Sequence, residues 1–143
     1  MPLTSFRTEV AAPVALLWQM LLEKIERPDL YVPGVERVEI KRRLGPGCVE
    51  RLMHLGGDRA VHEIITADEA THTVIFKLLD NPRYRGFVTN TIFADGGQVI
   101  LDYTMNWAPR AAADEVPEAN WSATLRGAVL HMKAMAEERA RAT

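Results

Sequence analysis

Three polar residues, Arg51, Glu63 and Asn90, lie in runs where the second residue on either side is apolar. Because alternate residues of a strand share a face, all three are expected to point inward with those apolar neighbours. A buried guanidinium requires a partner, and Glu63 is the expected one. Such a cluster can anchor a polar group of a bound molecule or, together with Tyr103, orient a ketone and move a proton.

The turn around Gly56 and Asp58 decides whether Arg51 and Glu63 meet. A three-residue loop places Arg51 opposite Glu63, whereas a two-residue turn pairs Arg51 with His62. If Arg51 and Glu63 do pair, they either anchor a ligand or only stabilise the sheet. For Asn90 the competing interpretation is a hydrogen bond to the backbone at a strand irregularity.

Metal and cofactor chemistry has little support in the sequence. His54 and His62 are expected as diagonal neighbours on the outer face, but Cys48 lies six residues from His54 on the same strand, too far to complete a zinc site. His131 is expected beside the apolar stripe of the last helix. Two interpretations are open: a base at the mouth of a cavity, or a residue that faces solvent. No phosphate loop, nucleophile elbow or dinucleotide fingerprint occurs, so we expect no cofactor and no metal.

Length and composition limit the class of protein. The 143 residues are 48% hydrophobic and carry a formal charge of −2, which fits a single domain over 1–143 and argues against nucleic-acid binding. The apolar run at 14–22 is too short to span a bilayer, and no secretory leader is recognised. We therefore expect a cytoplasmic protein without integral membrane association. The oligomeric state, a homodimer included, stays open.

Turn residues divide the chain into elements that must position the cluster. A strand is predicted at 3–11, a helix at 14–27 and a long helix at 118–141. Between the helices, six strands are predicted at 35–44, 48–55, 59–66, 71–80, 86–94 and 98–108. Their short connections favour an antiparallel meander. The predicted class is α+β, a seven-stranded curved antiparallel sheet around the C-terminal helix.

The last hairpin gives the sharpest expectation of register. A two-residue turn at Asp95 and Gly96 places Asn90 opposite Leu101. On the last strand, the alternation predicts one buried face and one exposed face. The expected buried residues are Leu101, Tyr103 and Trp107, and the expected exposed residues are Asp102, Thr104 and Asn106.

The element order and a few residues resemble a known family. The residues that carry this resemblance are Trp18, Arg27-Pro28, Tyr31-Val32-Pro33-Gly34-Val35, the run Gly86–Ile92, Tyr103 and Trp107. They resemble the START-like helix-grip (SRPBCC) superfamily, and more narrowly its AtaL-like branch. The resemblance implies a hydrophobic cavity between the sheet and the C-terminal helix. It implies no chemistry by itself, since the fold hosts carriers, receptors, cyclases and co-chaperones.

The leading hypothesis is therefore a protein that binds a small hydrophobic molecule, such as a lipid, polyketide or aromatic metabolite, through a polar anchor. The alternatives are an enzyme of the polyketide cyclase or dehydratase type and a protein-interaction module. No catalytic residue is assigned. The expected cavity residues are Arg51, Met53, Glu63, Phe76, Val88, Asn90, Leu101, Tyr103, Met105, Trp121, Leu125 and Met132.

Overall fold

The computed structural model describes residues 3–112 and 118–142. The chain begins with β1 (Leu3–Glu9), α1 (Val14–Glu26) and a 3-10 turn, η1 (Pro28–Leu30). The meander follows as β2 (Val35–Gly45), β3 (Cys48–Leu55), β4 (Ala60–Asp68), β5 (Thr73–Leu78), β6 (Tyr84–Asp95) and β7 (Gln98–Pro109). The long helix α2 (Glu118–Arg141) has the predicted bounds.

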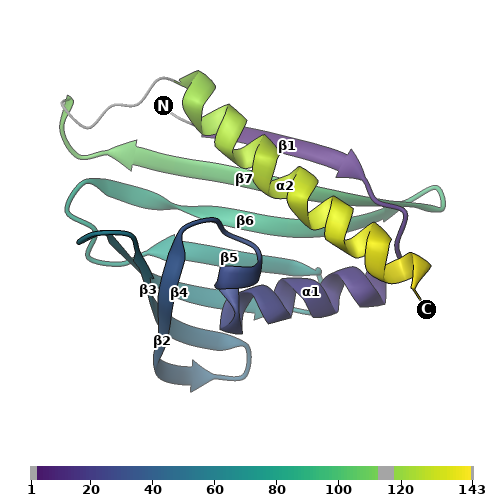
Figure 1. The fold of residues 1–143 in the computed structure, drawn as a ribbon, viewed down its shortest axis with the longest axis horizontal. Coiled ribbons are helices and arrows are strands. Elements are labelled where there is room, and N and C mark those ends of the chain that lie inside the picture. Colours follow the sequence, from purple (N-terminus) through teal and green to yellow (C-terminus); the bar gives the residue numbers. More distant parts are fainter. Residues whose placement is uncertain (1–2, 113–117, 143) are drawn as a thin grey trace.

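Within the described residues, seven strands form one antiparallel sheet in the order β1-β7-β6-β5-β4-β3-β2. Figure 1 shows the sheet curving below α2, which crosses it diagonally, with α1 lying near the C-terminal end of α2. This is the predicted α+β architecture. None of the helices in the described ranges is long and apolar enough to cross a membrane.

The first helix buries one stripe against the sheet. Pro13 precedes it in an extended conformation, and the helix ends at Glu26 because Pro28 disfavours helical backbone at the residue before it. Five apolar residues and one lysine of α1 are buried: Leu17, Trp18, Met20, Leu21, Lys24 and Ile25. The lysine therefore lies on the core-facing side of the helix.

The second helix packs chiefly on β1 and β7. Its buried residues recur at helical spacing: Leu125, Val129, Met132 and Ala136. They join α1 and the inner face of the sheet in the main core. A separate apolar cluster, consisting of Met53, Val61, Leu78 and Tyr84, lies beside Trp107 and Trp121. The rings of Tyr84, Trp107 and Trp121 lie 5.7 Å from one another.

The register of the last hairpin differs from the prediction. The turn consists of Gly96 and Gly97, with Asp95 paired to Gln98, so Asn90 lies opposite Tyr103 rather than Leu101. Both glycines have positive φ, 58° and 83°, the conformation that a two-residue hairpin turn of type I′ requires at both positions. Because the shift is two residues, Asn90 keeps its inward face.

The predicted exposure of Asp102 is wrong. Asp102 is 6% exposed, because β1 pairs with β7 and places Arg7 directly beside it, with Arg7 Nε 3.0 Å from its carboxylate. Leu101 and Tyr103 are buried as predicted, so the two faces are not exchanged. Trp107, expected to be largely buried, is only half-buried against Tyr84 and Trp121.

Candidate functional site

Arg51 and Glu63 form a buried ion pair. The three-residue loop between β3 and β4 places them directly opposite each other, which confirms the first of the two turn lengths considered. Arg51 Nη2 donates to Glu63 Oε1 at 2.7 Å, and the two side chains are 2% and 6% exposed. A buried pair of this kind needs further hydrogen bonds to offset the loss of hydration.

The guanidinium of Arg51 also caps the end of α1. Arg51 Nη1 donates to the backbone carbonyl oxygens of Ile25 at 2.9 Å and of Lys24 at 3.2 Å. These carbonyls belong to the last turn of the helix, where the chain supplies no helical partner and where the dipole favours a cation. Arg51 thus joins β3, β4 and α1.

Lys24 lies in the candidate site, although the sequence interpretation did not include it. Its side chain is buried, and Nζ donates to Asn90 Oδ1 at 2.7 Å. The ammonium lies 4.4 Å from the ring centre of Tyr103 and 5.0 Å from that of Phe76. Burial, and then the nearby charge of Arg51, lower the pKa of Lys24 to about 7, against the opposing effect of Glu63.

Two donors of this cluster have no acceptor among the residues that the structure describes. They are Arg51 Nε and Asn90 Nδ2, both in side chains that are almost wholly inaccessible to solvent. Burying an unpaired donor costs about 1–3 kcal/mol. We call Lys24, Arg51, Glu63 and Asn90 the polar cluster. It contains all three predicted polar anchors, and Lys24 connects Asn90 to the others.

Two of the remaining predicted cavity residues contact the polar cluster, and the others belong to or border the two apolar clusters of the fold. Phe76 and Tyr103 flank Lys24 directly, and burial raises the pKa of the Tyr103 phenol, which keeps it neutral. The residues that belong to the main core or border it are Val88, Leu101, Met105, Leu125 and Met132. Met53 lies in the separate apolar cluster with Trp121 at its border. The assignment of these apolar residues to a ligand cavity stays a prediction.

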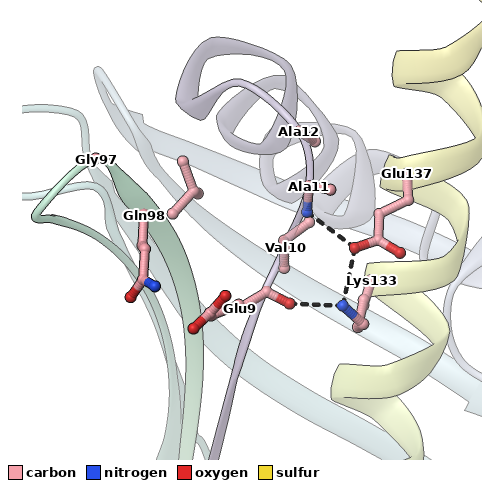
Figure 2. A pocket seen from close by; sticks show the side chains of 9 residues that line it. Glu9, Val10, Ala11, Ala12, Gly97, Gln98, Lys133 and Glu137 are labelled. Carbon is pink, nitrogen blue, oxygen red and sulfur yellow. Dashed lines mark hydrogen bonds and ion pairs between the residues drawn. The ribbon is translucent and has the colours of Figure 1, made fainter.

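A hollow of about 370 Å³ lies where the β6–β7 hairpin approaches the segment between β1 and α1. Figure 2 shows that Lys133 and Glu137 of α2 line it together with Glu9 and Ala11. Glu137 accepts the backbone N–H of Ala11 at 2.8 Å, and Lys133 donates to the carbonyl of Glu9 at 2.7 Å and to Glu137. The polar groups here pair with one another and tie α2 to the β1–α1 connection.

A second hollow, of about 230 Å³, lies closer to the polar cluster. Its apolar lining consists of Leu22, Ile25, Val49, Ile65 and Ala67. Val49 and Ile65 pair across β3 and β4, two residues along from Arg51 and Glu63, which corresponds to about 7 Å. No residue of the polar cluster lines either of these two hollows, but Ile25, the residue after Lys24, lines the second.

The histidines stay outside the polar cluster. His62 contacts Glu50 at 2.6 Å and His54 contacts Arg37 at 3.1 Å, so each is held by charged residues of β2 or β3. His131 is exposed, with Nε2 3.3 Å from the carbonyl of Leu30. Among the described residues, no group of three or more His, Cys, Asp or Glu side chains has the arrangement of a metal site.

Comparison with known proteins adds a family and a fold. The family model of AtaL, acetylaranotin biosynthesis cluster protein L, matches residues 14–140. No curated protein matches the chain.

Solved structures share the architecture at low identity. The Zhui aromatase/cyclase from Streptomyces sp. R1128 is 22% identical with a TM-score of 0.76, over 98% of this chain and 96% of that one. The di-domain ARO/CYC StfQ of the steffimycin pathway is 18% identical with a TM-score of 0.76, over 97% of this chain and 51% of its own. Ginseng major latex-like protein 151 from Panax ginseng is 9% identical with a TM-score of 0.71, over 94% and 96%.

Proposed function

Since the chain belongs to the AtaL family, within the START-like helix-grip superfamily, we propose that it binds a small, mostly apolar molecule whose polar group is held by the polar cluster. The single observation that carries this proposal is the pair of unpartnered donors, Arg51 Nε and Asn90 Nδ2, buried in an otherwise paired cluster. A bound acceptor would satisfy both donors. The apolar body of the ligand would lie between the inner face of the sheet and α2, among the predicted cavity residues.

Mass spectrometry of the intact protein under native conditions tests this function. Freshly purified wild-type protein is expected to carry a co-purified small molecule that is released on denaturation. The double variant Arg51→Leu with Glu63→Leu removes both partners of the buried ion pair, so neither of the two is left without its counter-charge. We expect it to fold and to lose the bound compound, while the matched control Arg42→Leu, at an exposed arginine of β2, keeps it. Full occupancy in the folded double variant would contradict the proposal.

A proton-transfer enzyme is the second candidate, and Lys24 favours it. A general base works best when its pKa lies near the working pH, and burial lowers the pKa of Lys24 to about 7. Such a base can remove a proton from a methylene group between two ketones, the step that begins ring closure of a poly-β-ketone. The neighbours named as aromatase/cyclases share this fold.

This second candidate has a separate test. A linear poly-β-keto thioester is incubated with the protein, and ring-closed products are sought by chromatography. Wild type should form product, and Lys24→Met should bind the thioester but form none. The variant Glu63→Gln distinguishes the role of Glu63 from that of Lys24. If this variant binds the thioester but does not turn it over, Glu63 carries out the proton transfer. Binding without any turnover by wild type would leave the binding function standing and exclude this reaction.

A further inference from the structure

The polar cluster holds more positive than negative charge. Lys24 and Arg51 are two cations, and Glu63 is the one buried carboxylate that contacts either of them within the described residues. Glu63 is engaged with Arg51, and no carboxylate in the described part of the chain lies within ion-pair distance of the Lys24 ammonium. An uncompensated buried charge is costly, and the two aromatic rings beside Lys24 offset it only in part.

The polar cluster also has more hydrogen-bond donors than acceptors. An ammonium can only donate, so its contact with Asn90 uses the amide oxygen of Asn90 and turns Nδ2 away as a free donor. Arg51 Nε is a donor as well. Both unpartnered atoms therefore require acceptors. A carboxylate accepts through both oxygens and donates nothing, whereas a hydroxyl or a primary amide would bring donors of its own.

We propose that the group held by the polar cluster is a carboxylate, so that the ligand is a small apolar acid, with Lys24 as the counter-ion that selects it. This inference rests on the proposed binding function and specifies its ligand class. Arg51 Nε and Asn90 Nδ2 supply the hydrogen bonds, and the carboxylate brings the charge of the cluster to zero. The apolar body lies among the predicted cavity residues, as proposed above, and the hollow lined by Leu22, Val49 and Ile65, two residues along the strands, adds apolar space on the α1 side of the cluster.

The charge of Lys24 links binding to pH. In the free protein Lys24 loses its proton near pH 7, and a bound carboxylate would hold that proton in place. The other groups that face Lys24 are Arg51 of β3, Glu63 of β4, Phe76 of β5, Asn90 of β6 and Tyr103 of β7. The phenol of Tyr103, with its raised pKa, stays neutral up to pH 9. Affinity for an acid should therefore fall up to about tenfold per pH unit between pH 7 and 9.

The test compares an acid with its neutral amide of nearly the same shape. Binding of 2-naphthoate and 2-naphthamide to the full chain is measured by titration calorimetry at pH 6.5. Wild type should bind the acid about tenfold or more tightly than the amide, a difference of about 1.4 kcal/mol. Lys24→Met and Lys24→Gln should remove this preference, and Lys77→Met, at an exposed lysine on β5, should retain it. Thermal unfolding of each variant verifies that it is folded.

The outcomes separate the inference from the function on which it rests. Equal affinity for acid and amide, both lost in the Arg51→Leu with Glu63→Leu variant, would overturn the carboxylate inference and leave the binding function intact. A preference for the acid that survives in folded Lys24→Met would also overturn the inference. Binding of neither probe to wild type would count against the binding function itself. Loss of the acid preference in both Lys24 variants, with an affinity that falls above pH 7, would support the inference.

Discussion

Arg51 and Glu63 face each other across β3 and β4, with Arg51 Nη2 2.7 Å from Glu63 Oε1 and both side chains removed from solvent. The same guanidinium caps the last carbonyls of α1, so one residue connects the end of the first helix to the sheet. This dual role distinguishes Arg51 from a simple ligand anchor. It also means that the stability of the fold and the integrity of the site depend on the same side chain.

Removing Arg51 alone should be strongly destabilising. Arg51→Leu leaves Glu63 as an unpaired buried carboxylate, and breaking such a pair typically costs about 3–5 kcal/mol of unfolding free energy. Adding Glu63→Leu should recover much of that loss but not all of it, because α1 still lacks its cap. Urea denaturation of the two variants measures both quantities. A double variant as unstable as Arg51→Leu would show that the unpaired charge is not the cause.

The pair of Arg42 and Glu50 provides a matched control on neighbouring strands, because its arginine is exposed and its carboxylate has His62 as a second partner. Its Nε–Oε1 distance is also 2.7 Å, but the Arg42 side chain is 66% exposed. Pairs between exposed side chains contribute about 0–1 kcal/mol, and when the exposed Arg42 is removed the less exposed Glu50 keeps its contact with His62. Arg42→Leu should therefore change the unfolding free energy far less than Arg51→Leu does, although the two contact distances are equal.

Lys24 should make the protein more stable as the pH rises above neutrality. Its pKa is lowered from 10.5 in the unfolded chain to about 7 in the folded protein, so between these values the unfolded state binds more protons. Stability then increases with pH, by at most about 1.4 kcal/mol per unit. Below pH 7 the penalty for burying the charge is fully present and constant. Tyr31 and Tyr103, whose pKa values are raised mainly by burial, reverse the trend only under more alkaline conditions.

Urea denaturation of wild type and Lys24→Met at pH 7, 8 and 9 isolates this contribution. The unfolding free energy of wild type should rise relative to that of Lys24→Met across the series. Parallel profiles for the two proteins would show that Lys24 does not change its protonation on unfolding in this range.

Two glycines should respond to alanine in opposite directions. Gly86 has φ of +131°, and a Cβ there would lie 1.6 Å from the carbonyl oxygen of Asn106 on the paired strand β7. Gly86→Ala should therefore cost about 2–5 kcal/mol through backbone strain and overpacking. Gly127 lies in α2 with open space around it, so Gly127→Ala should add about 0.5–1 kcal/mol by favouring the helix. Thermal unfolding compares the two, and a tolerated Gly86→Ala would contradict the pairing of β6 with β7.

The alternation of apolar residues was sufficient to predict the inward faces of Arg51, Glu63 and Asn90, because each lies on a strand with a local turn. Lys24 was not predicted, because a lysine near the end of a helix is expected to face solvent. The available signal was spacing: Lys24 follows Leu17 by seven residues and Met20 by four, so it continues the buried stripe. A charged residue in such a stripe indicates a buried partner.

Two predictions, the β6–β7 register and the exposure of Asp102, were wrong for different reasons. The β6–β7 register depended on which pair formed the turn, and Gly96 and Gly97 together tolerate the positive φ angles better than Asp95 with Gly96. The burial of Asp102 depended on Arg7, a residue far away in sequence that pairing of β1 with β7 brings alongside. Local patterns contain no information about that neighbour.

If the protein binds an acid as proposed, the two unpartnered donors of the polar cluster contact the bound ligand. Nuclear magnetic resonance of ¹⁵N-labelled protein observes the Arg51 Nε–H and the Asn90 side-chain amide directly. When 2-naphthoate is added, these two signals should shift and saturate together, at the affinity measured by calorimetry. The signal of the Arg7 Nε–H, which is paired with Asp102 on the outer face, should not shift. Saturable binding that leaves the Arg51 and Asn90 signals unmoved would contradict the account.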